Sequence, residues 1–380
     1  MMCIRMNLDQ RSDVKNLKGI DDMRNDRDVV KSKAEQSRSN LLDICKGVAI
    51  LLVVLGHNIQ YGSGVDFLNS GAYLVHPVFK FIYSFHMPLF TLISGYLCHI
   101  KDNDDIKKFV YRKIRGLFIP VFSWVILEFI LRALIGLQDI NTLMQFIVDF
   151  SRKLVYSYWY LWAILWCSIA VWIFEKYLNG NRILIIFLII ISMLIPNKIN
   201  SHLYIFVFPY YLVGYLWQRR LSKKSFSARH LKILFFLDTV FFVLLLPMYN
   251  YNSYIYTTQI YLFGDLGWLN QLSINVYRWL IGFAGAIFVI LILCFLKKIM
   301  WKSVKKFLIV LGKNTLGIYI ISTFINIYGY KIMYKIIGKH IKPNAFVWIS
   351  ESITCILICL FTCHIIKKQR ILNMILLGGR

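Results

Sequence analysis

The segment from Asp43 to Asn58 is expected to form an apolar membrane helix, yet it carries a lysine, Lys46, and eleven positions later a histidine, His57. Ionisable groups are costly inside a bilayer and are kept where they pair, line a cavity or take part in chemistry. Their spacing puts the two side chains roughly 16 Å apart along the axis and nearly on one side of the helix. One stripe therefore carries a cation near one membrane face and an imidazole toward the other.

The composition indicates a polytopic membrane protein, because 58% of the residues are hydrophobic and 16% are aromatic. A formal net charge of +25 is also compatible with nucleic-acid binding. The basic residues, however, stand in short clusters between apolar segments, which is typical of membrane-protein loops. We therefore expect an all-α fold in contact with membrane lipid, and no nucleic-acid partner.

About ten spans are predicted after a polar tail at residues 1–40. The tail holds nine Lys/Arg and seven Asp/Glu, which favours a disordered cytoplasmic extension over a signal peptide. The transmembrane domain would cover 41–366 and a C-terminal tail 367–380. The fifth and sixth spans are short, so they form either a tight hairpin or a re-entrant pair. The predicted spans are 41–61, 78–99, 116–136, 158–176, 182–196, 202–218, 231–249, 276–297, 307–328 and 346–366.

The distribution of Lys and Arg between the loops predicts the orientation of the chain. The loops at 100–115 and 219–232 hold six each, whereas the connections at 58–79 and 248–277 hold none. The loop at 329–345 departs from this pattern with four lysines. This distribution of Lys and Arg predicts that both termini lie in the cytoplasm, with His57 toward the outer surface. We expect the protein in a bacterial cytoplasmic membrane.

The eight cysteines do not suggest a metal site. Cys355, Cys359 and Cys363 follow one face of the last span at helical spacing, as small residues in a helix interface do. No Cys-x-x-Cys pair is present, and His or acidic partners at ligand spacing are not evident. We expect these thiols to pack and no metal to be bound.

Two histidines are expected to form the centre of a site. His86 lies in the second span, in the sequence Phe85-His-Met-Pro-Leu-Phe90, at a depth similar to that of His57. Two imidazoles from adjacent helices at one depth favour a shared site over isolated packing. Tyr83, one turn before His86, is a candidate substrate contact.

Charged residues elsewhere have both a structural and a functional interpretation. Arg112 and Arg115 share a helix face at i, i+3, which fits anchoring at the cytoplasmic surface or recognition of a polyanion such as the phosphates of coenzyme A. Glu128 and Arg132 at i, i+4 form an ion pair or orient a catalytic histidine. Arg278, near the outer end of the eighth span, is a candidate for bonding a sugar or an oxyanion.

The external connection 249–275 is the longest and contains an uncharged run rich in Tyr and Asn from Tyr249 to Tyr256. Aromatic and amide side chains suit sugar rings, because they stack on C–H faces and bond hydroxyl groups. The alternative is an aromatic belt at the membrane interface.

Taken together, these motifs resemble membrane acyltransferase family 3, and most closely its fucose 4-O-acetylase-like branch. Lys46-x10-His57 resembles the first-helix signature, the Phe85–Tyr96 segment the second-helix motif, and Arg112-x-x-Arg115 the Arg-x-x-Arg motif. The segment from Leu311 to Tyr319 resembles a late-helix motif, so the resemblance covers about 40–325. Two departures stand out: position 46 is Lys where much of the family has Arg, and Ile320-Ile321-Ser322 lacks a His that many relatives carry there.

The resemblance implies an O-acyltransferase that moves an acetyl or short acyl group from acyl-CoA to a glycan or lipid-linked oligosaccharide. Acetyl-CoA would bind at the cytoplasmic side, near Lys46, Arg112 and Arg115. His57 would act as general base or carry the acyl group transiently. Further roles are assigned as follows: Glu128 or Asn58 would orient the imidazole, and Arg278 or His86 would stabilise the oxyanion.

The rival interpretation is a transporter or flippase of lipid-linked sugars, which also fits about ten spans with ionisable residues at mid-depth. Paired halves with matching broken helices, which such a protein often has, are not evident. A scaffold role is the third possibility, and the aligned Lys46 and His57 stripe disfavours it.

Overall fold

The computed structural model describes residues 20–100, 105–134, 142–178, 181–194, 200–221, 227–263, 266–330 and 344–379. Within this part of the chain every regular element is a helix, as the hydropathy pattern predicts. The α-helices are α1 (Ile20–Tyr61), α2 (Val65–Ser70), α3 (Pro77–Tyr96), α4 (Ile106–Lys113), α5 (Ile119–Leu134), α6 (Leu143–Tyr156), α7 (Trp159–Lys176), α8 (Arg182–Ser192), α9 (Ser201–Leu216), α10 (Ala228–Leu245), α11 (Trp268–Ile299), α12 (Lys302–Lys313), α13 (Thr315–Phe324), α15 (Ala345–Lys368) and α16 (Arg370–Leu377).

Three short π-helical segments continue α-helices: η3 (Ile114–Phe118), η4 (Trp217–Leu221) and η7 (Ile325–Gly329). Three 3₁₀ turns lie in the connections: η2 (Ala72–Val75), η5 (Leu246–Met248) and η6 (Tyr251–Ser253). π-Helical turns recur at functional sites. The segment η3 directly follows the helix that carries Arg112.

Five helices in the described part are long and apolar enough to cross a membrane, and up to seven if two bent pairs each count as one span. The pairs are α6 with α7, bent by 61°, and α12 with α13, bent by 74°. Each predicted range overlaps helical residues, but the range 307–328 is divided between α12 and α13. In addition, α3 is polar at Lys80 and His86, and α8 and α9 are short. The count of about ten and the side on which each terminus lies therefore stay predictions.

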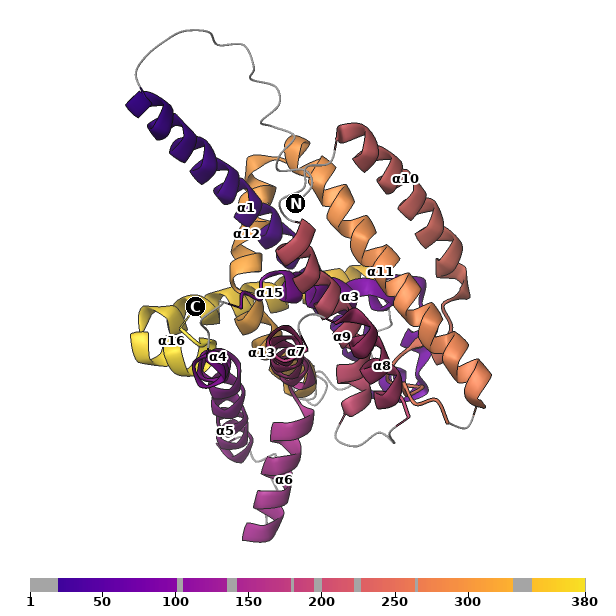
Figure 1. Ribbon diagram of the computed structural model, residues 1–380. Coiled ribbons are helices and arrows are strands. Elements are labelled where there is room, and N and C mark those ends of the chain that lie inside the picture. The colour runs from indigo at the N-terminus through magenta and orange to yellow at the C-terminus, as the bar shows by residue number, and fades with distance from the viewer. Residues whose placement is uncertain are drawn as a thin grey trace.

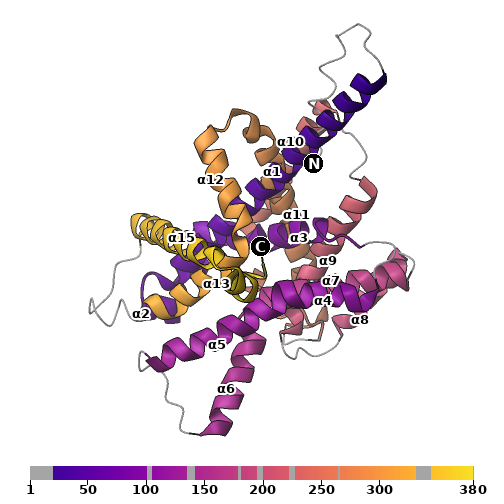
Figure 2. The ribbon, with the colours of Figure 1, turned by 90° about the vertical axis from the view of Figure 1, so that its left-hand side faces the viewer.

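The helix α1 begins at Ile20, inside the range expected to be a disordered tail. Helix formation is cooperative, so an established helix propagates into neighbouring polar residues at little further cost. Residues 1–19 lie outside the described part of the chain. In both views α1 runs from the edge of the molecule to its centre (Figure 1 and Figure 2).

Glycines allow the helices around α1 and α3 to approach closely. A Cβ on Gly312 of α12 would lie 1.9 Å from the Asp43 carbonyl oxygen of α1, and one on Gly47 would lie 2.2 Å from that of Leu308. Gly95 of α3 and Gly214 of α9 pack against each other's helices in the same way. Small residues at crossings are typical of membrane helix packing.

The C-terminal helix α16 packs against α5 near the start of the third predicted span. The Trp124 indole of α5 donates a hydrogen bond of 2.9 Å to the Leu376 carbonyl oxygen. The preceding helix α15 buries its three aligned cysteines against neighbouring helices. Among these, Cys363 lies against Gly317 of α13, which agrees with a packing role.

Candidate functional site

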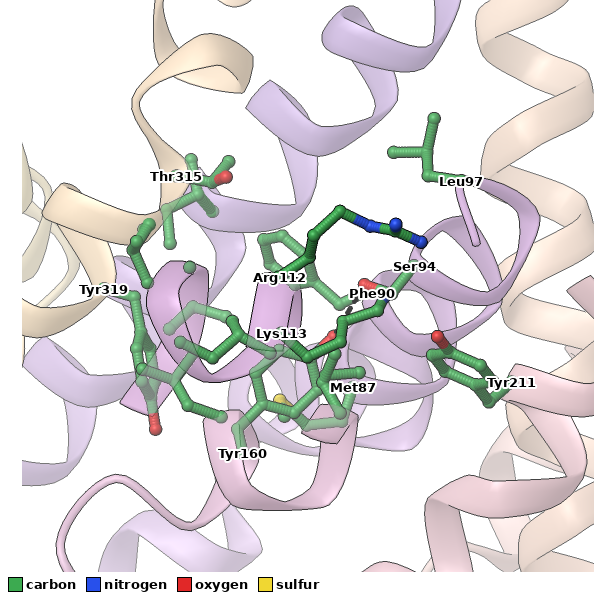
Figure 3. A pocket seen from close by; sticks show the side chains of 17 residues that line it. Met87, Phe90, Ser94, Leu97, Arg112, Lys113, Tyr160, Tyr211, Thr315 and Tyr319 are labelled. Atoms are coloured by element: carbon green, nitrogen blue, oxygen red, sulfur yellow. Dashed lines mark hydrogen bonds between the residues drawn. The ribbon is translucent and has the colours of Figure 1, made fainter. Parts of the chain in front are cut away.

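A cavity with a volume of about 230 Å³ lies where α1, α3, α4, α7, α9 and α13 meet (Figure 3). We call it the inner cavity. Its walls are largely apolar and carry a small number of polar groups, as is usual for small-molecule sites. The lining residues are Ile50, Val53, Met87, Phe90, Ser94, Leu97, Arg112, Lys113, Gly116, Leu117, Tyr160, Leu161, Ile164, Tyr211, Thr315, Leu316 and Tyr319.

The lining of the inner cavity combines two basic side chains with several aromatic ones. Arg112 and Lys113, from the last turn of α4, supply its two positive charges, and both lie beside the Phe109 ring. Tyr160 of α7 and Tyr319 of α13 also line the cavity, and their ring centroids are 6.1 Å apart. Figure 3 shows the two basic side chains and the tyrosines around a common space.

Arg112 and Arg115 do not point to the same place, although the sequence spacing predicts a shared face. Arg112 lines the inner cavity, whereas the Arg115 Nη2 lies 3.2 Å from Met374 Sδ of α16. The π-helical turn that begins at Ile114 explains the difference, because it changes the rotation per residue between the two arginines. A phosphate-binding role for Arg115 stays a prediction.

Lys46 lies one helical turn before the inner cavity. Ile50 and Val53, which follow it on the same stripe of α1, line the cavity wall. The Lys46 Nζ is 2.7 Å from Asp43 Oδ1, and its side chain is 21% exposed. Lys46 is not among the residues that line the cavity, and its ammonium pairs with a carboxylate one turn before it.

A second, smaller cavity of about 20 Å³ lies between α3, α7, α9, α11 and the connection after α10. We call it the outer cavity. It shares Met87 with the inner cavity, and Trp159 of its wall precedes Tyr160 of the other. Its lining residues are Tyr83, Ser84, His86, Met87, Trp159, Phe206, Tyr249, Ser253, Tyr254, Ile255, Tyr256, Arg278 and Ile281.

His86 has a defined tautomer. Its Nδ1 lies 2.8 Å from the Ile82 carbonyl oxygen, which only accepts, so Nδ1 carries the proton. The remaining ring nitrogen, Nε2, is therefore an acceptor, and the ring lines the outer cavity. The oxyanion role predicted for His86 would need an N–H at this nitrogen, which the neutral ring does not offer.

His57 is half-buried on α1, and its Nδ1 is buried without a hydrogen-bond partner among the described residues. Tyr83 joins its neighbourhood to His86. A Cβ on Gly56 would lie 2.9 Å from the Tyr83 ring, and that ring lies 4.6 Å from His86, centroid to centroid. Tyr83 thus lies beside His86 and beside Gly56, the residue before His57, and the shared site of the two imidazoles stays a prediction.

Asn58 faces away from this region. Its amide donates to Ser352 Oγ at 2.8 Å and accepts from the Tyr330 hydroxyl at 2.7 Å. These contacts tie the C-terminal end of α1 to α15 and to the residue that follows η7. Within the described residues neither of these hydrogen bonds of Asn58 involves His57, so its role in orienting that imidazole stays a prediction.

Glu128 lies in a buried cluster with partners that the sequence spacing did not suggest. Its carboxylate pairs with Lys153 of α6 and accepts a hydrogen bond from the Tyr328 hydroxyl. Arg132, the predicted partner, places its guanidinium 5.9 Å from the Tyr328 ring centroid. The α5–α6 contact brings Lys153 to the acid, and local spacing carries no information on such a contact.

Arg278 is 2% exposed, and its guanidinium is surrounded by backbone carbonyls of the connection between α10 and α11. Nε donates to the Ser253 oxygen at 3.0 Å and Nη1 to Asn275 Oδ1 at 3.0 Å. Nη2 lies within hydrogen-bond distance of three further carbonyl oxygens, those of Asn252, Tyr254 and Thr258. These donors hold the loop, and the predicted contact with a sugar or oxyanion stays a prediction.

The chain matches the acyltransferase domain of family 3 over residues 40–366. The chain belongs to acyltransferase family 3. It is also similar to Nodulation protein NolL of Sinorhizobium fredii, 31% identical over 215 residues, which are 54% of this chain and 56% of the relative. Nodulation protein NolL of Mesorhizobium japonicum is 27% identical over 189 residues, 48% of each chain. The chain thus spans about half the length of these curated relatives, and no solved structure matches it.

Several residues of this family 3 domain line the cavities without having been singled out in the sequence. Met87 separates the two cavities, and Tyr160 and Tyr319 line the inner one. The position of Tyr319 at the end of the late-helix motif was the available signal. Met87 lies beside His86, but an apolar residue in an apolar helix gives no signal of its own. The described residues contain no group of three or more His, Cys, Asp or Glu placed to hold a metal.

Proposed function

We propose that this protein is an integral membrane O-acyltransferase of the bacterial cytoplasmic membrane. It would move an acetyl or other short acyl group from acyl-CoA to a hydroxyl of a cell-surface or exported polysaccharide. The observation that carries the proposal is the arrangement of the two cavities, one cationic and one aromatic, on either side of Met87. A transfer between a charged donor and a sugar needs two such compartments.

The inner cavity suits the donor. Arg112, Lys113 and the nearby Lys46 would attract the phosphates of coenzyme A, for which arginine and lysine are the usual partners. Its volume of about 230 Å³ is below the roughly 300–1,000 Å³ of drug-sized ligand pockets. It therefore fits the acyl-pantetheine arm, with the nucleotide remaining outside at the cytoplasmic surface.

The transfer would take place where the cavities approach each other. His57 would remove the proton from the acceptor hydroxyl as the oxygen attacks the thioester carbon. The new carbon–oxygen bond forms, the carbon–sulfur bond breaks, and the imidazolium returns the proton to the departing thiolate of CoA. His86, whose Nε2 is an acceptor, would position the acceptor by accepting a hydrogen bond from a neighbouring hydroxyl of the same sugar.

The test is CoA release from acetyl-CoA by the purified full chain in detergent, with cell-surface glycan supplied, for wild type and His57→Ala. Glycan-dependent release that is lost in the variant supports the proposal. Release from neither protein, with a glycan known to be competent, would favour a transporter of lipid-linked sugars. Release that survives in His57→Ala would keep the activity and move the proton acceptor elsewhere.

A further inference from the structure

We propose that the outer cavity is the acceptor site and takes an uncharged sugar ring, with Arg278 as the residue that positions its aromatic wall. This inference rests on the proposed acyl transfer. It adds the chemical class of the acceptor and a role for the most deeply buried arginine of the described chain. Three observations carry it: the aromatic lining, the absence of an available charge, and the loop contacts of Arg278.

Aromatic side chains from three parts of the chain surround the outer cavity. Trp159 of α7 and Tyr256 of the connection have ring centroids 6.2 Å apart, at 78°. Tyr83 of α3 and Tyr254 of the connection are also 6.2 Å apart, at 64°. Rings set at steep angles present both faces and edges, and tyrosine adds a hydroxyl for hydrogen bonding. Such walls suit a sugar ring, whose faces carry C–H groups and whose rim carries hydroxyls.

The lining offers no donor fork to an anion. Arg278 is the only charged residue of the lining, and its guanidinium nitrogens are committed to Asn275 and to four backbone carbonyls. The run from Tyr249 to Tyr256 is uncharged. A carboxylate placed here would lose its hydration without gaining a charge-assisted pair, which is costly. An uncharged sugar ring loses far less hydration free energy when it enters the cavity.

Arg278 sets the shape of this wall by binding the backbone on both sides of Tyr256. It bonds the carbonyls of Asn252, Ser253 and Tyr254 before it and that of Thr258 after it. The Tyr254 hydroxyl then donates to the Leu74 carbonyl oxygen at 2.7 Å. The loop is thus fixed between α11 and the segment before α3, with Tyr256 at its turn.

The cavity as it stands has room for about one water molecule, at about 20 Å³. A sugar ring therefore enters when a wall side chain moves. Tyr256 is the lining residue suited to this, because it is 53% exposed while the loop backbone beneath it is held. Rotation of one side chain is a common response to binding, and it leaves the Arg278 contacts in place.

Binding of two matched glycosides to the purified full chain tests the site without requiring turnover. Methyl β-glucopyranoside and methyl β-glucuronopyranoside share a ring and differ by a carboxylate. Calorimetric titration should give a dissociation constant at least about tenfold lower for the uncharged glycoside. Equal affinities, or no binding of the uncharged glycoside, would overturn the proposal.

Two tyrosines of one loop provide a matched comparison. Tyr256→Leu should weaken glucoside binding by about tenfold, because it removes an aromatic wall. Tyr251→Leu is the control: Tyr251 is 62% exposed in the same loop but does not line the cavity. The affinity of the Tyr251→Leu variant for the glucoside should stay within about twofold of that of the wild type. Equal losses in the two variants would assign the effect to the loop fold and refute the site.

Arg278→Lys tests the positioning role, because lysine keeps the charge but lacks the fork that spans several carbonyls. In protein that remains folded, we expect the apparent KM for glycan to rise by about tenfold while the KM for acetyl-CoA stays unchanged. A rise in both constants would reveal a general loss of structure. Glucoside binding without CoA release from any acceptor would keep the site and reject the acyl transfer.

Discussion

The inner and outer cavities both have an arginine in their walls, but the two arginines are placed in opposite ways. Arg112 is exposed at the end of α4, where its side chain extends into the inner cavity over the Phe109 ring. Arg278 is 2% exposed, and backbone carbonyls surround it. An exposed guanidinium can offer charge to a ligand, whereas a buried, bonded one gives shape to its surroundings.

This difference separates two ways of recognising a substrate at one transfer site. The inner cavity provides charge, which suits a polyanionic donor. The outer cavity provides aromatic surface arranged by a buried charge, which suits an uncharged acceptor. Met87 is shared by both walls, so the two modes of recognition meet across a single apolar side chain.

The largest expected effect concerns His57, the proposed general base, which is not among the residues that line either cavity. His57→Ala should lower the rate of acyl transfer by roughly 10²–10⁴-fold, because removal of a general base costs about that much. Single-turnover CoA release by protein of equal membrane yield would measure it. His86→Ala should weaken transfer less. The reverse order would assign proton removal to His86.

The second prediction contrasts the two arginines in stability. Arg278→Met should destabilise the fold by roughly 3 kcal/mol, because several buried carbonyls lose their donor. Arg112→Met should change stability by less than about 0.5 kcal/mol, since its side chain is exposed. Thermal unfolding in one detergent compares the pair. Equal shifts would remove the structural distinction between the two arginines.

The third prediction separates Arg112 from Arg115 at the donor side. Arg112→Gln should raise the KM for acetyl-CoA by about tenfold, whereas Arg115→Gln should have a smaller effect, because Arg115 contacts Met374 of α16. Initial rates at varied donor concentration measure both. Equal increases in the KM for acetyl-CoA would support the shared phosphate site that the sequence spacing predicts.

The smallest effect is expected at the edge of the inner cavity. Trp124→Phe removes the hydrogen bond to the Leu376 carbonyl, which should cost about 1 kcal/mol of stability. Its donor KM should stay near that of wild type. A large increase in that KM would show that α16 shapes the donor entrance as well as bracing α5.

The sequence allowed the helical fold and the family to be predicted, because hydropathy and the spacing of Lys46, His57 and the later motifs are local properties. The partners of Glu128 and Arg278 were not predictable in this way. Lys153 reaches Glu128 through the contact of α5 with α6, and the carbonyls around Arg278 come from a loop with no regular pattern. The number of spans stays a prediction. The 74° bend between α12 and α13 divides the predicted range 307–328, and hydropathy alone does not reveal such a break.

The π-helical turn at Ile114–Phe118 bears on the length of the chain as well as on its composition. Such a turn contains one residue more than an α-helical turn of the same span. Deleting one residue there would restore a regular α-helix and leave the preceding helix, with Arg112 and Lys113, near its present orientation. Deleting one residue from the regular α-helix next to this turn would instead rotate the two sides against each other by about 100°. Binding of the proposed donor should therefore tolerate a one-residue deletion inside this turn far better than one in the α-helix beside it.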